Sequence, residues 1–117
     1  MKLINIFVLL LLSSALSYSQ VTATQPPNLE TCDEVPFDGF AEFDLETQTP
    51  IILDAQDPAN FEVTYHENED DANNGVNAII SPYSNLVNPE VIYARVTEMS
   101  TGEYATTNFI ITVIDCS

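Results

Sequence analysis

Residues 105–114 read Ala-Thr-Thr-Asn-Phe-Ile-Ile-Thr-Val-Ile, the strongest run of alternating side chains in the chain. Thr107, Phe109, Ile111 and Val113 fall on one face, and Thr106, Asn108, Ile110 and Thr112 fall on the other. Because successive side chains of a strand point to opposite faces, this pattern predicts a half-buried β-strand.

Two earlier runs share the period of two. Residues 91–97 place Ile92, Ala94 and Val96 on one face, and residues 61–66 alternate Phe61, Val63 and Tyr65 with Glu62, Thr64 and His66. The turn residues Ser100-Thr101-Gly102 join the last two runs and predict an antiparallel hairpin. Shorter strands are expected at residues 40–45 and 51–53. The pattern predicts an all-β fold, an immunoglobulin-like antiparallel β-sandwich of about seven short strands.

One stretch lacks the strand pattern. Residues 67–75 read Glu-Asn-Glu-Asp-Asp-Ala-Asn-Asn-Gly and contain no apolar side chain larger than that of Ala72. We expect at most a helical turn on the surface, ended by Gly75.

The N-terminal residues predict export. Lys2 precedes an apolar run at residues 3–12, and the small residues Ser17 and Ser19 follow it. A basic start, a short apolar run and a small-x-small exit predict a secretory signal peptide at residues 1–19. The run is shorter than the roughly 20 apolar residues of a membrane span. Residues 20–28, with Pro26-Pro27, predict an extended linker, and residues 29–117 the folded domain.

Charge limits the class of partner. The chain has 18 Asp and Glu against two Lys and Arg, and beyond the signal region Arg95 is the only strong base. Binding to nucleic acid or anionic lipid needs basic residues, so this composition argues against both. It allows cationic partners and Ca²⁺, although the simpler explanation is a well-solvated acidic surface.

Two cysteines bracket the predicted domain. In an oxidising compartment Cys32 and Cys116 are expected to pair, although an intermolecular bond and free thiols remain open. Cys32 lies too far beyond the signal region for lipid attachment, so a lipoprotein is not expected.

Two acidic groups are candidate Ca²⁺ sites, because carboxylates are hard oxygen ligands. The first comprises Asp33, Asp38 and Asp44, and the second comprises Glu67, Glu69, Asp70 and Asp71. An EF-hand loop beginning at Glu34 fails, because Pro36 and Leu45 occupy ligand positions. The alternative for both groups is a set of solvated acids.

The sequence offers little for catalysis. The single histidine, His66, shares the polar face of its strand and is expected at the surface, and no nucleophile or phosphate-binding motif is present. We therefore expect no enzyme. Arg95 is expected to form a structural ion pair with a carboxylate, the alternative being an anchor for an acidic ligand.

Several short segments in a fixed order suggest a family. They are Cys32-Asp33, Asp38-Gly39, Phe43-Asp44-Leu45, Val63-Thr64-Tyr65, Asn77-Ala78-Ile79, Ser81-Pro82-Tyr83, Ile92-Tyr93-Ala94-Arg95-Val96 and Thr101-Gly102-Glu103-Tyr104. From about Glu30 to Val113 this succession resembles a repeat of large surface adhesins and gliding-associated proteins exported by Bacteroidota bacteria. The resemblance implies an immunoglobulin-like module with a structural or adhesive role at the cell surface.

The chain departs from those repeats at its cysteines. Glu103 stands where the repeats often carry a cysteine, and Cys116 lies beyond their usual end, so their disulfide pattern is not transferred. We expect a secreted or surface-exposed module whose partner is a protein or a glycan. The alternative is a small secreted domain that binds carbohydrate with calcium. A sugar site usually combines exposed aromatic rings with polar groups, and only Tyr83 and Tyr104 are placed near loops for that purpose.

Overall fold

The computed structural model describes residues 20–33 and 36–116. The predicted signal peptide and Glu34 therefore lie outside the described residues. The elements in chain order are β1 (Leu29–Asp33), β2 (Glu42–Phe43), η1 (Leu45–Gln48), α2 (Thr49–Leu53), β3 (Phe61–His66), α3 (Glu69–Asn74), β4 (Tyr83–Ser84), β5 (Glu90–Glu98) and β6 (Tyr104–Asp115). Within these residues no helix is long and apolar enough to cross a membrane.

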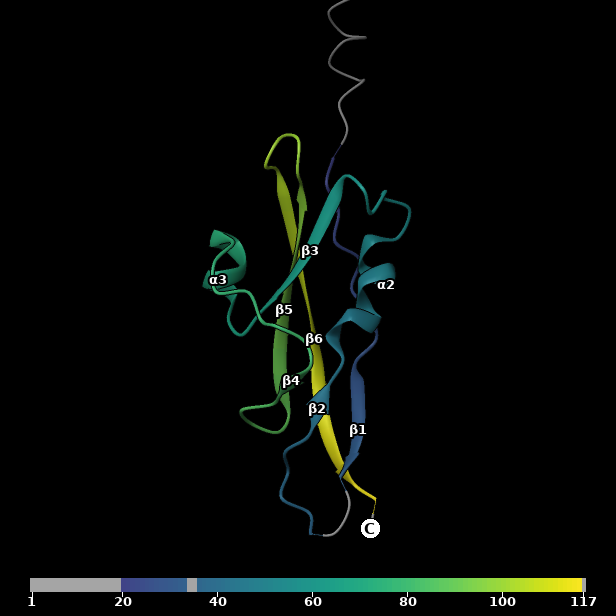
Figure 1. Ribbon diagram of the computed structural model, residues 1–117, viewed down its shortest axis with the longest axis vertical. Helices are drawn as coiled ribbons and strands as arrows, with labels where there is room; N and C mark the ends of the chain where they lie inside the picture. The colour runs from purple at the N-terminus through teal and green to yellow at the C-terminus, as the bar shows by residue number, and fades with distance from the viewer. Residues whose placement is uncertain (1–19, 34–35, 117) are drawn as a thin grey trace, which may run out of the picture.

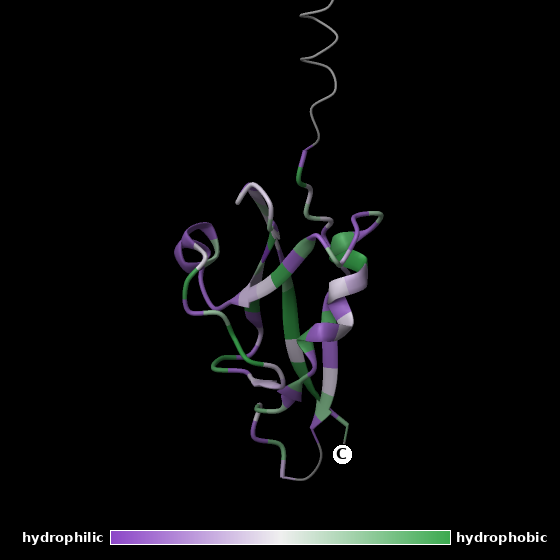
Figure 2. Cartoon of the chain, turned by 45° about the horizontal axis from the view of Figure 1, so that its top comes forward, coloured by the Kyte–Doolittle hydropathy of each residue, from purple (hydrophilic) through white to green (hydrophobic). Residues whose placement is uncertain are grey.

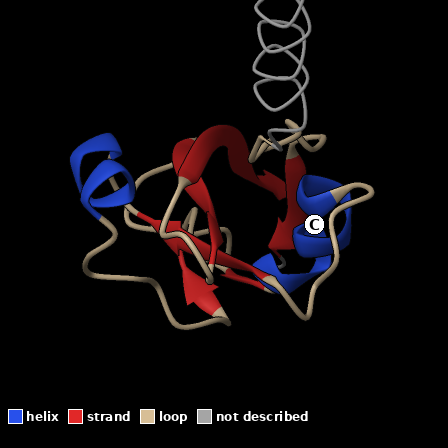
Figure 3. Ribbon diagram, turned by 90° about the horizontal axis from the view of Figure 1, so that it is seen from above, coloured by secondary structure: helices blue, strands red, loops and turns tan. Residues whose placement is uncertain are grey.

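The strands form two sheets, one of four strands in the order β1-β6-β5-β3 and one that pairs β2 with β4. Figure 1 shows the long strands running side by side, with α3 on one flank and α2 on the other. Seen from above, the strands curl between the two helical segments (Figure 3). The predicted all-β, sandwich-like fold is confirmed.

The β5–β6 hairpin forms as the alternation predicts. Its register pairs Ile92 with Phe109 and Ala94 with Thr107. At its turn Gly102 has a φ of 80°, where a side chain would be strained, and donates its N–H to the carbonyl of Glu98 at 2.8 Å. The long period-two runs thus decide the centre of the fold.

The core lies between the four-stranded sheet and the shorter elements. The buried apolar side chains are Phe43, Leu45, Ile52, Leu53, Tyr65, Tyr83, Ile92, Ala94, Val96, Phe109, Ile111 and Val113. Tyr65 meets Phe109 edge to face, with the ring centroids 6.2 Å apart. Figure 2 shows hydrophobic residues along the inner strands and in α2, whereas α3 is hydrophilic. The hydrophobic layer therefore combines strand faces with side chains from η1 and α2.

The strand pairing differs from the prediction at one edge. β1 pairs with β6 in parallel, from Leu29 opposite Ile111 to Asp33 opposite Asp115, whereas the other pairs are antiparallel. The described residues form six strands, where about seven were predicted. A parallel pair joins segments that are far apart in the chain, and no turn signal marks it.

The predicted strand at residues 51–53 is wrong, because these residues lie in α2. Asp44 caps the preceding η1 turn by accepting the N–H of Glu46 at 3.2 Å. Pro50 then occupies the first turn of α2, where a missing N–H costs nothing. The helix buries Ile52 and Leu53 and leaves Ile51 exposed. The strand predicted at residues 40–45 is reduced to Glu42–Phe43.

Residues 20–28 form neither helix nor strand, and they are hydrogen-bonded to the domain along their length. Thr24 donates its N–H to the carbonyl of Ile52 at 3.1 Å, and Gln48 donates its side-chain amide to the carbonyl of Pro27 at 2.6 Å. Val21 and Ala23 pack against the core. The segment therefore adds to the fold before β1 begins.

Candidate functional site

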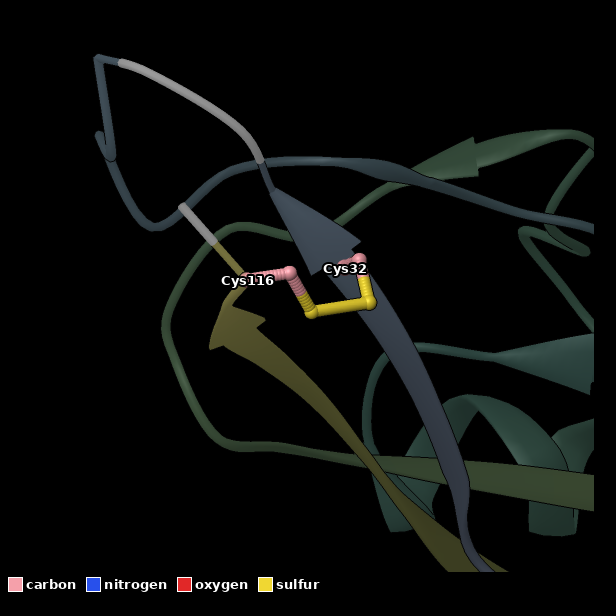
Figure 4. The surroundings of a disulfide bond; sticks show 2 residues. All are labelled: Cys32 and Cys116. Atoms are coloured by element: carbon pink, nitrogen blue, oxygen red, sulfur yellow. A yellow bond between two sulfur atoms is a disulfide. The ribbon is translucent and has the colours of Figure 1, made fainter.

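The joined ends of β1 and β6 form the most distinctive feature of the molecule. Cys32 and Cys116, 84 residues apart in sequence, form a disulfide with their Cα atoms 5.4 Å apart (Figure 4). The predicted pairing is confirmed, and it closes the chain within one domain. The parallel register explains it, because Cys32 lies opposite Ile114 and Cys116 follows β6 after Asp115.

Asp33, beside the disulfide, organises the loop that follows β1. Its carboxylate accepts the backbone N–H groups of Asp38 at 3.0 Å and of Gly39 at 3.3 Å. The hydrogen bond from the Asp38 backbone is the main reason that the pKa of Asp33 is lowered. The N–H of Cys116 donates to the backbone carbonyl of Asp33 at 3.3 Å. The C-terminal ends of β1 and β6 and this loop are thus held together.

The first calcium candidate is divided among separate turns. Asp33 and Asp38 accept backbone N–H groups within their loop, whereas Asp44 caps η1. A carboxylate in such a position gives the backbone N–H groups of a turn or helix end the hydrogen-bond acceptor that they would otherwise lack.

The second calcium candidate surrounds α3. Glu69, Asp70 and Asp71 lie in its first turn, where negative charge is favourable, and Asn68 caps it by accepting the N–H of Asp71 at 2.9 Å. Glu67 instead accepts the Tyr83 hydroxyl at 3.2 Å. Among the described side chains, no three of His, Cys, Asp and Glu form a group that could hold a metal ion. Calcium binding stays a prediction.

Arg95 joins the end of α3 to the sheet. Its guanidinium donates to the carbonyl oxygens of Ala72 at 3.0 Å and Asn73 at 2.9 Å, and to the Thr97 hydroxyl at 2.9 Å. It also lies 3.9 Å from the centroid of the Tyr104 ring. Carbonyls at a helix C-terminus carry partial negative charge, so a cation is favourable there. The predicted ion pair with a carboxylate stays a prediction.

His66 is buried, so its expected surface position is wrong. Only 1% of its surface is exposed, and its ring nitrogens bond to the Thr64 hydroxyl and to the carbonyl of Val76, both at 2.8 Å. The segment after α3 folds back over the sheet, where Ile79 donates its N–H to the carbonyl of Tyr65 at 2.7 Å. This covering segment buries a side chain that alternation alone places on the outer face.

A buried acid that sequence reasoning missed lies at the start of β5. Glu90 is 7% exposed, and its carboxylate accepts the Tyr83 hydroxyl at 2.6 Å and the Leu86 N–H at 2.7 Å. Burial, and then the Glu90 carboxylate, raise the pKa of Tyr83 above its usual range. Glu90 lies two residues before Ile92 and four before Ala94, so it falls on the same, inward face of the strand. This alternation was the sequence signal for its burial. Tyr83 is therefore part of the interior and not a loop aromatic ring.

Comparison with known proteins gives one result. Residues 28–117 match the family described as the Flavobacterium inter-domain disulphide bond domain. Neither the curated proteins nor the solved structures contain a match. The match covers every described strand and both cysteines, and the chain belongs to the Flavobacterium inter-domain disulphide bond domain family.

Proposed function

We propose that this chain is an exported, non-catalytic module with a structural or adhesive role at the cell surface. The observation that supports this most is the Cys32–Cys116 bond, which ties the first strand of the domain to the last. Disulfides persist in oxidising compartments, and a disulfide-bonded domain of this family suggests an extracellular or periplasmic location. The predicted signal peptide at residues 1–19 would deliver it there.

The arrangement of the chain ends suits a spacer. The purple segment that precedes β1 lies at one end of the long strands, and the C-terminus lies at the other (Figure 1). Parallel pairing produces this arrangement, because β1 and β6 run in the same direction. A domain with its ends at opposite poles adds its full length to whatever it connects. Its acidic loops would then face a protein or glycan partner.

Export is tested with the full chain carrying a C-terminal tag in a Flavobacterium host. We expect the tag to be cleaved by protease added to intact cells, and the protein to be absent from the cytoplasm. The matched control lacks residues 2–19 and stays inside. A full chain that remains in the cytoplasm with free thiols would contradict the proposal. An adhesive role makes a further prediction. Latex beads coated with the exported protein should bind to host cells better than beads coated with its unfolded form.

The alternative is a secreted domain that binds carbohydrate with calcium. It predicts that Ca²⁺, but not Mg²⁺ at equal ionic strength, raises the unfolding temperature relative to EDTA. A free Ca²⁺ concentration of one hundred times the Kd would add about 2.7 kcal/mol to the free energy of unfolding. Equal, small rises in both salts indicate charge screening and favour the structural role. If the protein binds to a glycan array and EDTA abolishes that binding, the carbohydrate-binding alternative is established instead.

A further inference from the structure

The disulfide creates a short covalent path between the two ends of the domain. Starting from Gln20, the chain reaches Cys32 at the end of β1, and the disulfide then leads directly to Cys116. The 84-residue separation between the cysteines contains the rest of the fold. A force applied to the two ends therefore has a covalent route that avoids that segment.

We propose that the domain transmits tension between its ends through the Cys32–Cys116 bond, so that the fold between the cysteines is not stretched. This inference rests on the proposed function, because a spacer that is held at both ends carries the tension between them. It goes further by assigning the bond a mechanical task in addition to its effect on folding stability.

The direction of the strands supports this load path. Because β1 and β6 are parallel and the chain ends lie at opposite poles, tension pulls β1 toward one pole and the end of β6 toward the other. The strands are then sheared past each other along five registered pairs, from Leu29 opposite Ile111 to Asp33 opposite Asp115. The disulfide lies at the end of this pair nearest the C-terminus, where it blocks the sliding (Figure 4).

The segment before β1 is fastened to the same body. Gln56 and Thr22 exchange two hydrogen bonds, at 3.0 and 2.8 Å, and Ile110 donates its N–H to the Asn28 side chain at 2.9 Å. Tension must break these contacts before it loads the disulfide. Residues 29–32 already lie in β1, and residues 20–32 fully stretched span at most about 45 Å. Only a small lengthening is available while the bond is intact.

The loss of the bond would release a much longer segment. An 84-residue separation corresponds to about 280–300 Å of extended chain, against 5.4 Å between the bonded Cα atoms. The two states therefore differ in maximum length by an amount that single-molecule pulling resolves directly.

The experiment pulls the exported chain in an optical trap, with one handle inserted between Ser19 and Gln20 and the other placed after Ser117. For the oxidised protein we expect no lengthening step near 280–300 Å at any force that leaves the handles intact. The variant Cys32→Ser/Cys116→Ser should show that step, or the full length from the start if it does not fold. A 280–300 Å step in the oxidised protein without reductant would overturn the proposal.

Two controls separate the load path from stability. Ile111→Ala weakens the core but keeps the bond, so it should show no long step even though it unfolds more easily. With a phosphine reductant under constant force, the bond of the oxidised wild type should be cleaved faster as the force rises. A rate independent of force would mean that the bond lies outside the load path. Neither result depends on where the protein is located. The export test can therefore fail while this inference stands, and this inference can fail while the export test succeeds.

Discussion

Removal of the disulfide tests how the fold is held together. We consider the variant Cys32→Ser/Cys116→Ser. Both cysteines are exposed, so serine removes little packing, and the main effect is on the unfolded chain. The bond closes a loop of 84 residues, and loop-closure entropy assigns such a cross-link about 4.5 kcal/mol.

That free energy is large for a domain of this size. The total free energy of unfolding of a native domain is about 5–15 kcal/mol. For such a domain each kcal/mol changes the unfolding temperature by about 4–8 °C, so the variant should melt roughly 20–35 °C below the oxidised wild type. The hydrogen bond from the Cys116 N–H to Asp33 does not involve sulfur and can persist in the variant.

The assay is thermal unfolding of the exported protein, followed by circular dichroism with and without dithiothreitol. Reduced wild type should melt near the double variant, and the reductant should leave the double variant unchanged. Identical far-ultraviolet spectra at low temperature would show that both proteins fold. A difference below about 5 °C between oxidised wild type and variant would refute the reasoning, since the cross-link would then not restrict the unfolded chain.

Three further predictions follow from buried or bonded side chains. Tyr83→Phe removes the hydroxyl that donates to Glu90, and should lower the free energy of unfolding in urea by about 1.5–3 kcal/mol; a loss below about 0.5 kcal/mol would contradict the buried hydrogen bond. Arg95→Met removes the donors to the end of α3 and the contact with Tyr104, and should cost about 1–3 kcal/mol, with faster hydrogen exchange confined to α3; unchanged exchange there would contradict the capping role. Burial raises the pKa of Tyr65 to about 12, so the neutral hydroxyl is favoured in the folded state. The contribution of the neutral Tyr65 hydroxyl to the free energy of unfolding should be fully present below pH 10 and fall by about 3 kcal/mol as the pH rises through 12. Tyr65→Phe should therefore flatten that part of the profile of unfolding free energy against pH. An identical alkaline decline in the variant would count against this role of Tyr65.

The long strands could be predicted because their signal is local and repeated. In β5 and β6 the alternation continues over 9 and 12 residues, and a glycine turn joins them. The helical turn of α3 was equally accessible, because its acidic run ends at a glycine with a φ of 67°. In both cases the local sequence and the tertiary structure favour the same conformation.

The missed features depend on contacts between distant segments. The three apolar residues 51–53 are compatible with a strand or a helix, and the cap and proline before them decide the outcome. His66 is buried by a segment about ten residues later, which alternation within β3 cannot reveal. The parallel β1–β6 edge likewise joins residues 82 apart in the sequence, such as Leu29 and Ile111. Spacing alone left the pairing of Cys32 with Cys116 open for the same reason.

The most direct test of the structural account is non-reducing peptide mapping of the protein recovered from outside the host cells. We predict a peptide pair in which Cys32 is linked to Cys116 of the same chain, and an N-terminus at Gln20. Mixed isotope labelling distinguishes a bond within one chain from a bond between two. Cys32 linked to another chain or another domain, or both thiols free, would contradict the claim that the disulfide joins the ends of β1 and β6.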